Sequence, residues 1–182
     1  MTSRTESFDV SGPPRIEVSL RAGDVIIREA DGDAVTVALS GDDETVETTQ
    51  IQATTGTVSV RSGHQKHRWL FKTMDVVITT PPGGIVRVNV GAGDVAIAVR
   101  LESVNVKTGA GDVHLNEAVG DVRVKIAAGD LTIVGSVDDA VLTSASGDIH
   151  VDIVRDVVVH TASGTIDLGT VTNTAKIRAA SG

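Results

Sequence analysis

The sequence contains no cysteine, and this absence excludes two classes of small domain. Without thiols, the chain can build neither a disulfide framework nor a zinc site with thiolate ligands. Aromatic residues are almost as rare, with one tryptophan, two phenylalanines and no tyrosine. Val, Ile, Ala and Leu supply the hydrophobic 41% of the 182 residues instead. This composition is sufficient for the core of one domain and suits narrow sheets stacked face to face.

Positive charge is also in deficit. Sixteen lysines and arginines stand against 24 aspartates and glutamates, which gives a formal net charge of −8. A nucleic-acid-binding protein needs a basic surface to displace counterions from phosphates, so we expect no nucleic-acid partner. No run approaches the roughly 18 apolar residues of a membrane span. The start, MTSRTESFDVSGPPRIEV, lacks the basic and apolar regions of a signal peptide. We therefore expect no membrane insertion and a cytoplasmic location.

The chain is rich in a nine-residue repeat. Units such as VHLNEAVGD (113–121) and VRVKIAAGD (122–130) follow one another without a break. The strongest glycines recur at every second unit, at a nearly constant spacing: Gly93, Gly111, Gly129, Gly147, Gly164 and Gly182. One unit, IHVDIVRD (149–156), is a residue short. The nonapeptide is therefore half of a true period of about 18 residues.

Each unit alternates apolar and polar residues. Val113 and Leu115 are apolar, whereas the intervening His114 and the following Asn116 are polar. A period of two predicts a strand with one buried face. The small segment that follows predicts a turn, because glycine reaches positive φ and aspartate bonds its own backbone two residues on.

Strand, turn, strand and turn within one such period predict one coil of a flattened, parallel β-solenoid. Each coil adds one strand to each of two parallel sheets, at a spacing of roughly 4.8 Å. An antiparallel sandwich is the alternative, since nine-residue spacing also suits hairpins. Turns of the type AxG or SxG occur on every second corner, which favours the two-sided coil. The predicted fold class is therefore all-β, with two strands per coil and a coil of about 18 residues.

We expect one solenoid domain over residues 1–182. Residues 8–42 form a first repeat block that includes three nonapeptides, and 85–182 form the regular coils. The pattern breaks over 43–84, where strands are expected around 49–61 and 74–80, with a charged loop at 62–72. We expect this segment to add partly antiparallel strands that cap the solenoid, because an open end presents unpaired backbone groups.

The chain resembles a known bacterial family. The start FDVSGPPRIEVSLRAGDVIIREADGD, the later VRVNVGAGDV and the serial SGDI- and AGDV-type units are similar to the "putative adhesin" family of β-strand repeat proteins. That family is also described as a domain of unknown function. The resemblance covers essentially the whole chain and implies a β-solenoid with a surface or interaction role. It implies no catalytic residues.

Aspartates recur with the glycines and fall on both edges of the coil: Asp94, Asp112, Asp130 and Asp148 on one, Asp121, Asp139 and Asp156 on the other. Stacked carboxylates about 5 Å apart repel by about 1 kcal/mol in water. Compensation comes either from turn amides or from bound cations such as Ca²⁺. We expect the amides, because the calcium-binding nonapeptide GGxGxDxUx is matched only faintly. A regular ladder also singles out no carboxylate pair for glycoside hydrolysis, so we expect neither an enzyme, a metal nor a cofactor.

The histidines suggest no zinc site. His114 and His150 share an outward position but lie two coils apart, about 9.6 Å at strand spacing. Zinc ligands must reach a metal at about 2.0–2.1 Å. His160 lies on the other sheet, and His64 and His67 lie in the charged loop without an obvious carboxylate. We interpret all five as solvent-facing.

Two groups of residues are candidate interaction surfaces. Lys107, Arg123 and Lys125 start a basic stripe on one sheet, which serves either solubility or the binding of a polyanion. Trp69 and Phe71 form an aromatic cluster in the charged loop, which either contacts a partner or plugs the solenoid end.

The predicted function is a non-catalytic structural or protein-interaction scaffold. Two alternatives remain open. One is an adhesin-like ligand-binding module. The other is a polymerising, bactofilin-like solenoid, because the last unit, AKIRAASG (175–182), shows no cap and its edge could pair with another chain. The expected partner is thus another protein or a second copy bound through the solenoid ends.

Overall fold

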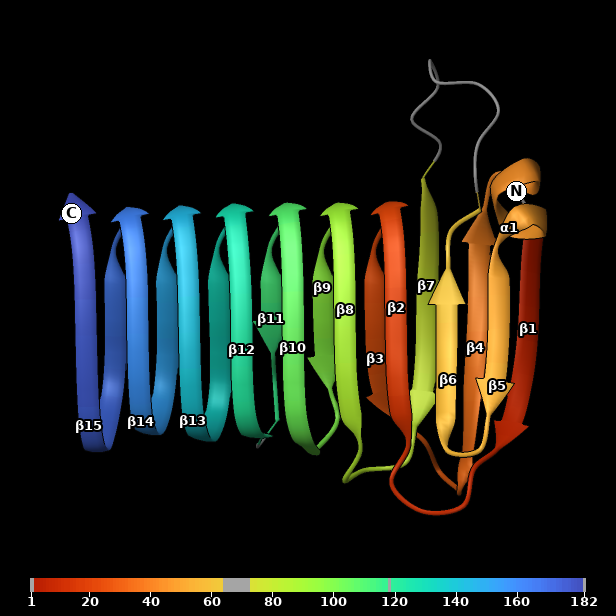
Figure 1. Cartoon of the computed structure of the whole chain (residues 1–182), viewed down its shortest axis with the longest axis horizontal. Coiled ribbons are helices and arrows are strands. Elements are labelled where there is room, and N and C mark those ends of the chain that lie inside the picture. The colour runs from red at the N-terminus through yellow and green to blue at the C-terminus, as the bar shows by residue number, and fades with distance from the viewer. Residues whose placement is uncertain (1, 64–72, 118, 182) are drawn as a thin grey trace.

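The computed structural model describes residues 2–63, 73–117 and 119–181. Figure 1 shows coils stacked along one axis, each with a strand facing the viewer and a strand behind it. The strands of the front sheet are β2 (Arg15–Ala22), β8 (Ile85–Ala92), β10 (Leu101–Ala110) and β12 (Val119–Ala128). Those of the back sheet are β3 (Val25–Glu29), β9 (Val95–Ala98) and β11 (Val113–Leu115). Three long strands bend from the back sheet into the front sheet: β13 (Leu131–Ser146), β14 (Ile149–Ser163) and β15 (Ile166–Ser181).

The register confirms the period that the sequence predicts for one coil. Val106 pairs in parallel with Val88 on one side and with Val124 on the other. Each of these partners is one full period away along the chain, so equivalent side chains stack in rows across the coils. Val124 then pairs with Leu142, and these inward residues are at most 3% exposed. Each fully buried aliphatic side chain contributes about 1.5–3 kcal/mol to the core.

The short unit, 149–156, causes one irregularity on each side of β14. Between Val154 and Asp156, β14 advances two residues while β15 advances three. Between Ile133 and Ser136 the strand β13 advances three residues while β14 advances two. The extra residue lies beside Gly135, whose φ of 109° only glycine adopts readily. Beyond this bulge, Leu142 pairs with Val159 in the regular way. The shorter step therefore leaves the core register intact.

The N-terminal part departs from the expected repeat block. Strands β2 and β3 form a coil in register with β8 and β9, as the nonapeptides predict. However, β4 (Ala34–Gly41) runs antiparallel to both β1 (Thr2–Asp9) and β7 (Met74–Thr80). Alternation determines which side chains of a strand are buried, but it carries no information on strand direction. The sequence of 34–42 therefore predicts part of a parallel coil, but these residues form an antiparallel strand.

Residues 43–84 extend both sheets beyond the first coil. In the front sheet, β6 (Thr57–Arg61) lies parallel to β2 and forms a hairpin with β5 (Gln50–Thr54). In the back sheet, β7 lies parallel to β3. A short helix, α1 (Asp43–Thr48), begins at the N-cap Asp42 and buries Val46. No helix among the described residues is long and apolar enough to cross a membrane.

One corner of every coil is built by glycine. The corner glycines have φ values between 123° and 144°: Gly23, Gly93, Gly111, Gly129, Gly147 and Gly164. They also stack without space for a side chain. A Cβ on Gly129 would lie 2.2 Å from the carbonyl oxygen of Gly111. Both the conformation and the close approach therefore require glycine.

An alanine at a corner is expected to be strongly destabilising. We expect Gly129→Ala to lower the free energy of unfolding by about 3 kcal/mol or more, from backbone strain and the clash with Gly111. Gly32→Ala is the matched control, since a Cβ there meets no atom within 4 Å. Urea unfolding of both variants checks the expectation. Equal stability of the two variants would contradict it.

Candidate functional site

The outward face of the front sheet carries the predicted basic residues close together. Lys107 on β10 is the register partner of Lys125 on β12. Arg123 lies two residues before Lys125 and so points to the same side of the sheet. Among the described residues, none of these three side chains has an ion-pair or hydrogen-bond partner. We call Lys107, Arg123 and Lys125 the basic patch.

The patch is bordered by mixed residues. Arg87 on β8 belongs to the row of Arg123, and its Nη1 lies 4.0 Å from Oε1 of Glu17 on β2. Beyond β12, the rows continue with Val141 and Thr143 on β13. Cations return on β15, where Lys176 and Arg178 continue the two rows. The stripe is interrupted, as expected from the sequence.

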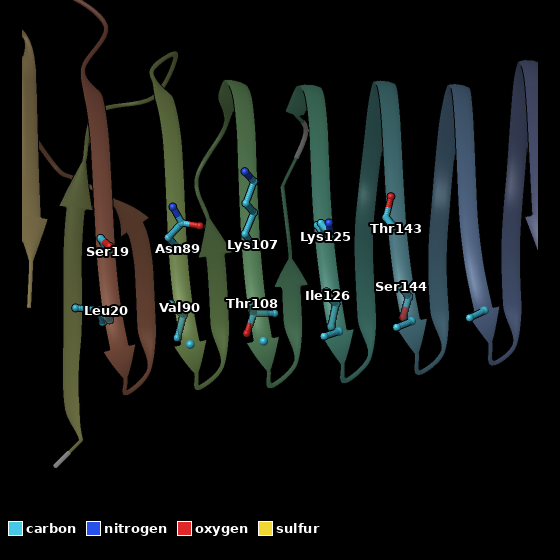
Figure 2. A pocket seen from close by; sticks show the side chains of 15 residues that line it. Ser19, Leu20, Asn89, Val90, Lys107, Thr108, Lys125, Ile126, Thr143 and Ser144 are labelled. Carbon is cyan, nitrogen blue, oxygen red and sulfur yellow. The ribbon is translucent and has the colours of Figure 1, made fainter. Parts of the chain in front are cut away.

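An open groove of about 670 Å³ runs beside the basic patch (Figure 2). One side carries the row of Ser19, Asn89, Lys107, Lys125 and Thr143. Its floor is a row of small residues at the next outward position: Gly91, Gly109, Ala127, Ala145 and Ala162. The glycines leave no space for a side chain, since a Cβ on Gly109 would lie 2.5 Å from the carbonyl oxygen of Gly91. The groove has the size of an ordinary small-molecule site.

Ser144 borders the groove, but its side chain faces the core and is buried without a partner among the described residues. It is 4% exposed, and its Oγ has no hydrogen-bond partner in this part of the chain. Thr108 and Thr161 occupy the same row, and their hydroxyls donate to the carbonyl oxygens of Ala110 at 3.3 Å and Ser163 at 3.0 Å. An unsatisfied buried hydroxyl costs about 1–3 kcal/mol. The buried Ser144 hydroxyl therefore lowers the stability of the fold, whereas the hydroxyls of Thr108 and Thr161 are hydrogen-bonded and do not.

The aspartates at the glycine corner form a hydrogen-bonded ladder. Oδ1 of Asp94 accepts from the backbone N–H of Asp112 at 2.8 Å, and Oδ1 of Asp112 accepts from that of Asp130 at 2.8 Å. The same bond joins Asp130 to Asp148, and Asp148 to the N–H of Thr165. Turn amides thus compensate the stacked carboxylates. The sequence predicts donation from amides of the aspartate's own turn. The amides that donate belong instead to the next coil.

At the opposite edge of the coils, an arginine compensates the stacked carboxylates. Asp121, Asp139 and Asp156 lie in register on adjacent strands. The Arg155 guanidinium lies 2.9 Å from Asp139 and 3.2 Å from Asp156, and it also reaches Asp138 at 3.4 Å. Among the described residues, no group of three or more acidic or histidine side chains is placed to hold a metal ion.

His150 is the histidine with carboxylate partners. Its Nε2 lies 2.9 Å from Asp152, and its Nδ1 lies 2.9 Å from Asp167 on the neighbouring strand β15. The hydrogen bond to Asp152, followed by that to Asp167, raises the pKa of His150 above 6.5. His114 shares its row with Thr132 in between, so the predicted separation of two coils is confirmed. His160 lies on the front sheet, whereas His64 and His67 lie outside the described residues.

His150 should make stability depend on pH. Because its pKa is higher in the folded state, its contribution is complete below pH 6.5 and is lost as pH rises through the folded pKa. We expect His150→Asn to lower the melting temperature at pH below 6.5 and to have less effect at higher pH. His114→Asn, in the same row without a carboxylate partner among the described residues, is the control. A His150→Asn effect that grows with pH would contradict the assignment.

The basic patch could be predicted from the sequence, whereas the groove was not predicted. The small residues that form its floor recur at the coil period, so their row was visible in the sequence. Nothing in the sequence showed that the hydroxyl of Ser144 lacks a partner among the described residues, because this depends on its side-chain geometry. Trp69 and Phe71, the other predicted interaction residues, lie outside the described residues.

Comparison with solved structures shows the same fold in bacterial proteins. One is described as a "putative cell adhesion protein" from Clostridium sporogenes, with a TM-score of 0.58 and 10% sequence identity, over 97% of this chain and 100% of the other. Another is described as a "putative lipid binding protein" from Parabacteroides distasonis, with a TM-score of 0.51 and 15% identity, over 99% and 95% of the two chains.

No curated protein matches the sequence. The family model described as Toastrack DUF4097 matches residues 14–182, which include every complete coil and the whole of the groove. The chain therefore belongs to the Toastrack DUF4097 family, as the predicted resemblance to a bacterial adhesin-like family of unknown function indicated.

Proposed function

We propose that the chain is a non-catalytic, adhesin-like interaction scaffold that binds an anionic partner through the front sheet. The observation that carries this proposal is the basic patch. Lys107, Arg123 and Lys125 are concentrated on two adjacent strands, without acidic partners among the described residues. They stand out in a chain whose formal net charge is −8. A local field of opposite sign steers anionic partners to this face.

The acidic residues support the same assignment. The corner carboxylates are engaged by backbone N–H groups, and Arg155 contacts three aspartates at the opposite edge. These charges have partners within the fold, whereas the basic patch is available to an outside partner. A repeat scaffold that presents one charged face is a common basis for binding.

The groove gives no support for catalysis. Its lining contains neither a carboxylate nor a histidine among the described residues. General acid–base chemistry needs a titratable group within hydrogen-bonding reach of the substrate. We therefore propose that the chain is not an enzyme.

The descriptions of the two solved neighbours, one a cell adhesion protein and one a lipid binding protein, agree with a binding role. The cytoplasmic location expected from the sequence stays a prediction. The adhesion description points instead to the cell surface.

The basic patch is tested with fluorescently labelled polyglutamate as a defined anionic probe. We expect binding that weakens with salt and that is reduced roughly three- to tenfold in Arg123→Ala/Lys125→Ala, because each exposed ion pair contributes up to about 1 kcal/mol. Arg28→Ala/Arg100→Ala removes the same charge from exposed positions outside the front sheet and is the matched control. Fluorescence anisotropy measures both. Equal losses in the two double variants would overturn the assignment to the front sheet.

Self-association through a solenoid end is a second candidate function. Within the described residues, β15 pairs with β14 on one side only. Ile177 continues the buried row of Val159 on this strand but is 50% exposed. An unpaired strand with exposed core positions is a template for another strand, and we propose that a second copy supplies it.

Sedimentation velocity tests this second candidate. We expect a species larger than the monomer that is lost in Ile177→Glu, because the charge would be placed at the shared edge. Val134→Glu is the control, since Val134 is similarly exposed, at 43%, on an earlier coil. A strict monomer over the whole accessible concentration range would exclude self-association.

A further inference from the structure

We propose that the groove beside the basic patch binds a single-chain anionic amphiphile, such as a free long-chain fatty acid. Its carboxylate would lie at Lys107 and Lys125, and its hydrocarbon chain would lie along the row of small residues. This inference rests on the proposed binding through the front sheet, and it names the class of ligand.

The shape of the groove suits one extended chain. Its lining residues come from six neighbouring strands of the front sheet, from Ser19 on β2 to Ala162 on β14. At a strand spacing of about 4.8 Å, this corresponds to a length of about 24 Å. The groove thus crosses the strands as a narrow furrow, and the floor presents nothing larger than a methyl group.

The lining gives the groove an apolar part. Figure 2 shows Leu20, Val90 and Ile126 following one another along one side of it. These side chains are between 2% and 5% exposed and face the core, so they support the groove from beneath. The apolar surface of the groove itself comes from the methyl groups of Ala127, Ala145 and Ala162. Towards β2 the floor consists of Gly91 and Gly109, which present backbone alone. A hydrocarbon chain placed there would bury apolar surface on both partners.

The polar part is built from the basic patch. Lys107 and Lys125 lie on adjacent strands without acidic partners among the described residues, so a carboxylate would relieve the repulsion between two like charges. Thr143 is the register partner of Lys125 and extends the same outward row with a hydroxyl. Ser144 follows it, but its side chain faces the core and does not reach the groove.

Other ligands use fewer of these features. A sugar chain favours aromatic platforms, and the described residues that line the groove include none. An acidic peptide would use the lysines but would gain nothing from a floor of glycine and alanine. The combination of a narrow floor of small residues and two cations favours an amphiphile with a single tail.

The test uses laurate below its micellar concentration, with acetate and dodecanol as probes of the head and the tail alone. We expect one laurate to bind per chain in equilibrium dialysis. Acetate and dodecanol should bind at least about tenfold more weakly, because each lacks one of the two contributions. Equal binding of laurate and dodecanol would overturn the role of the lysines.

Variants locate the binding. Ala127→Leu and Ala145→Leu fill the floor at exposed positions, and each is expected to weaken laurate binding at least about tenfold. Ala96→Leu, at an outward position of the back sheet, is the control. Ser144→Ala should leave laurate and dodecanol binding unchanged, because this side chain faces the core. It should not lower stability, because the buried hydroxyl has no partner to lose among the described residues.

The outcomes separate the two proposals. Loss of laurate binding in both floor variants, with polyglutamate binding retained, supports the amphiphile site. Absence of laurate binding in a chain that still binds polyglutamate overturns the amphiphile inference and leaves the basic patch as an anionic docking face. Binding of neither probe overturns both. Laurate binding that survives both floor variants shows association elsewhere on the chain and also overturns the inference. Circular dichroism shows that each variant is folded.

Discussion

Parallel pairing of each coil with the coil before it is the constraint on which the rest of the structure depends. The pairing places every residue beside its equivalent one period earlier, as the series Val88, Val106 and Val124 shows. Any property of one position is therefore repeated as a row across the molecule. Rows of buried valine form the core, rows of glycine form the corners, and rows of small outward residues form the groove. The candidate site is thus a product of stacking rather than of a local motif.

Stacking also brings like charges together, and the fold resolves this conflict differently at each place. At the glycine corner, each carboxylate accepts a hydrogen bond from the backbone of the next coil, so that the charge holds two coils together. At the opposite edge, Arg155 contacts three aspartates at once. Lys107 and Lys125 have no such compensation among the described residues. These two lysines therefore differ from the aspartates, whose repulsion is offset by partners within the fold.

Much of this arrangement could be predicted from the sequence, because the period and the alternation are direct consequences of the coil. The pairing of Lys107 with Lys125 and the separation of His114 from His150 follow from counting residues. The antiparallel direction of β4 could not be predicted, since alternation is the same in both directions. Helix α1 is short and depends on the N-cap Asp42 and the burial of Val46, so no periodic pattern in the sequence predicts it. The state of the Ser144 hydroxyl depends on angles and distances that residue types do not encode.

The bulge beside Gly135 shows that strict register does not make the molecule intolerant of changes in length. The coil that ends in β14 is one residue shorter than its neighbours, yet Val159 still lies beside Leu142. The discrepancy appears once on each side of β14: on β13 between Ile133 and Ser136, beside Gly135, and on β15 between the partners of Val154 and Asp156. Pairing is regular before and after each shift, so a change in coil length disturbs the register only locally. Such a fold can vary the length of individual coils, and hence the loops displayed along one edge, while the core and the rows of the front sheet stay in phase.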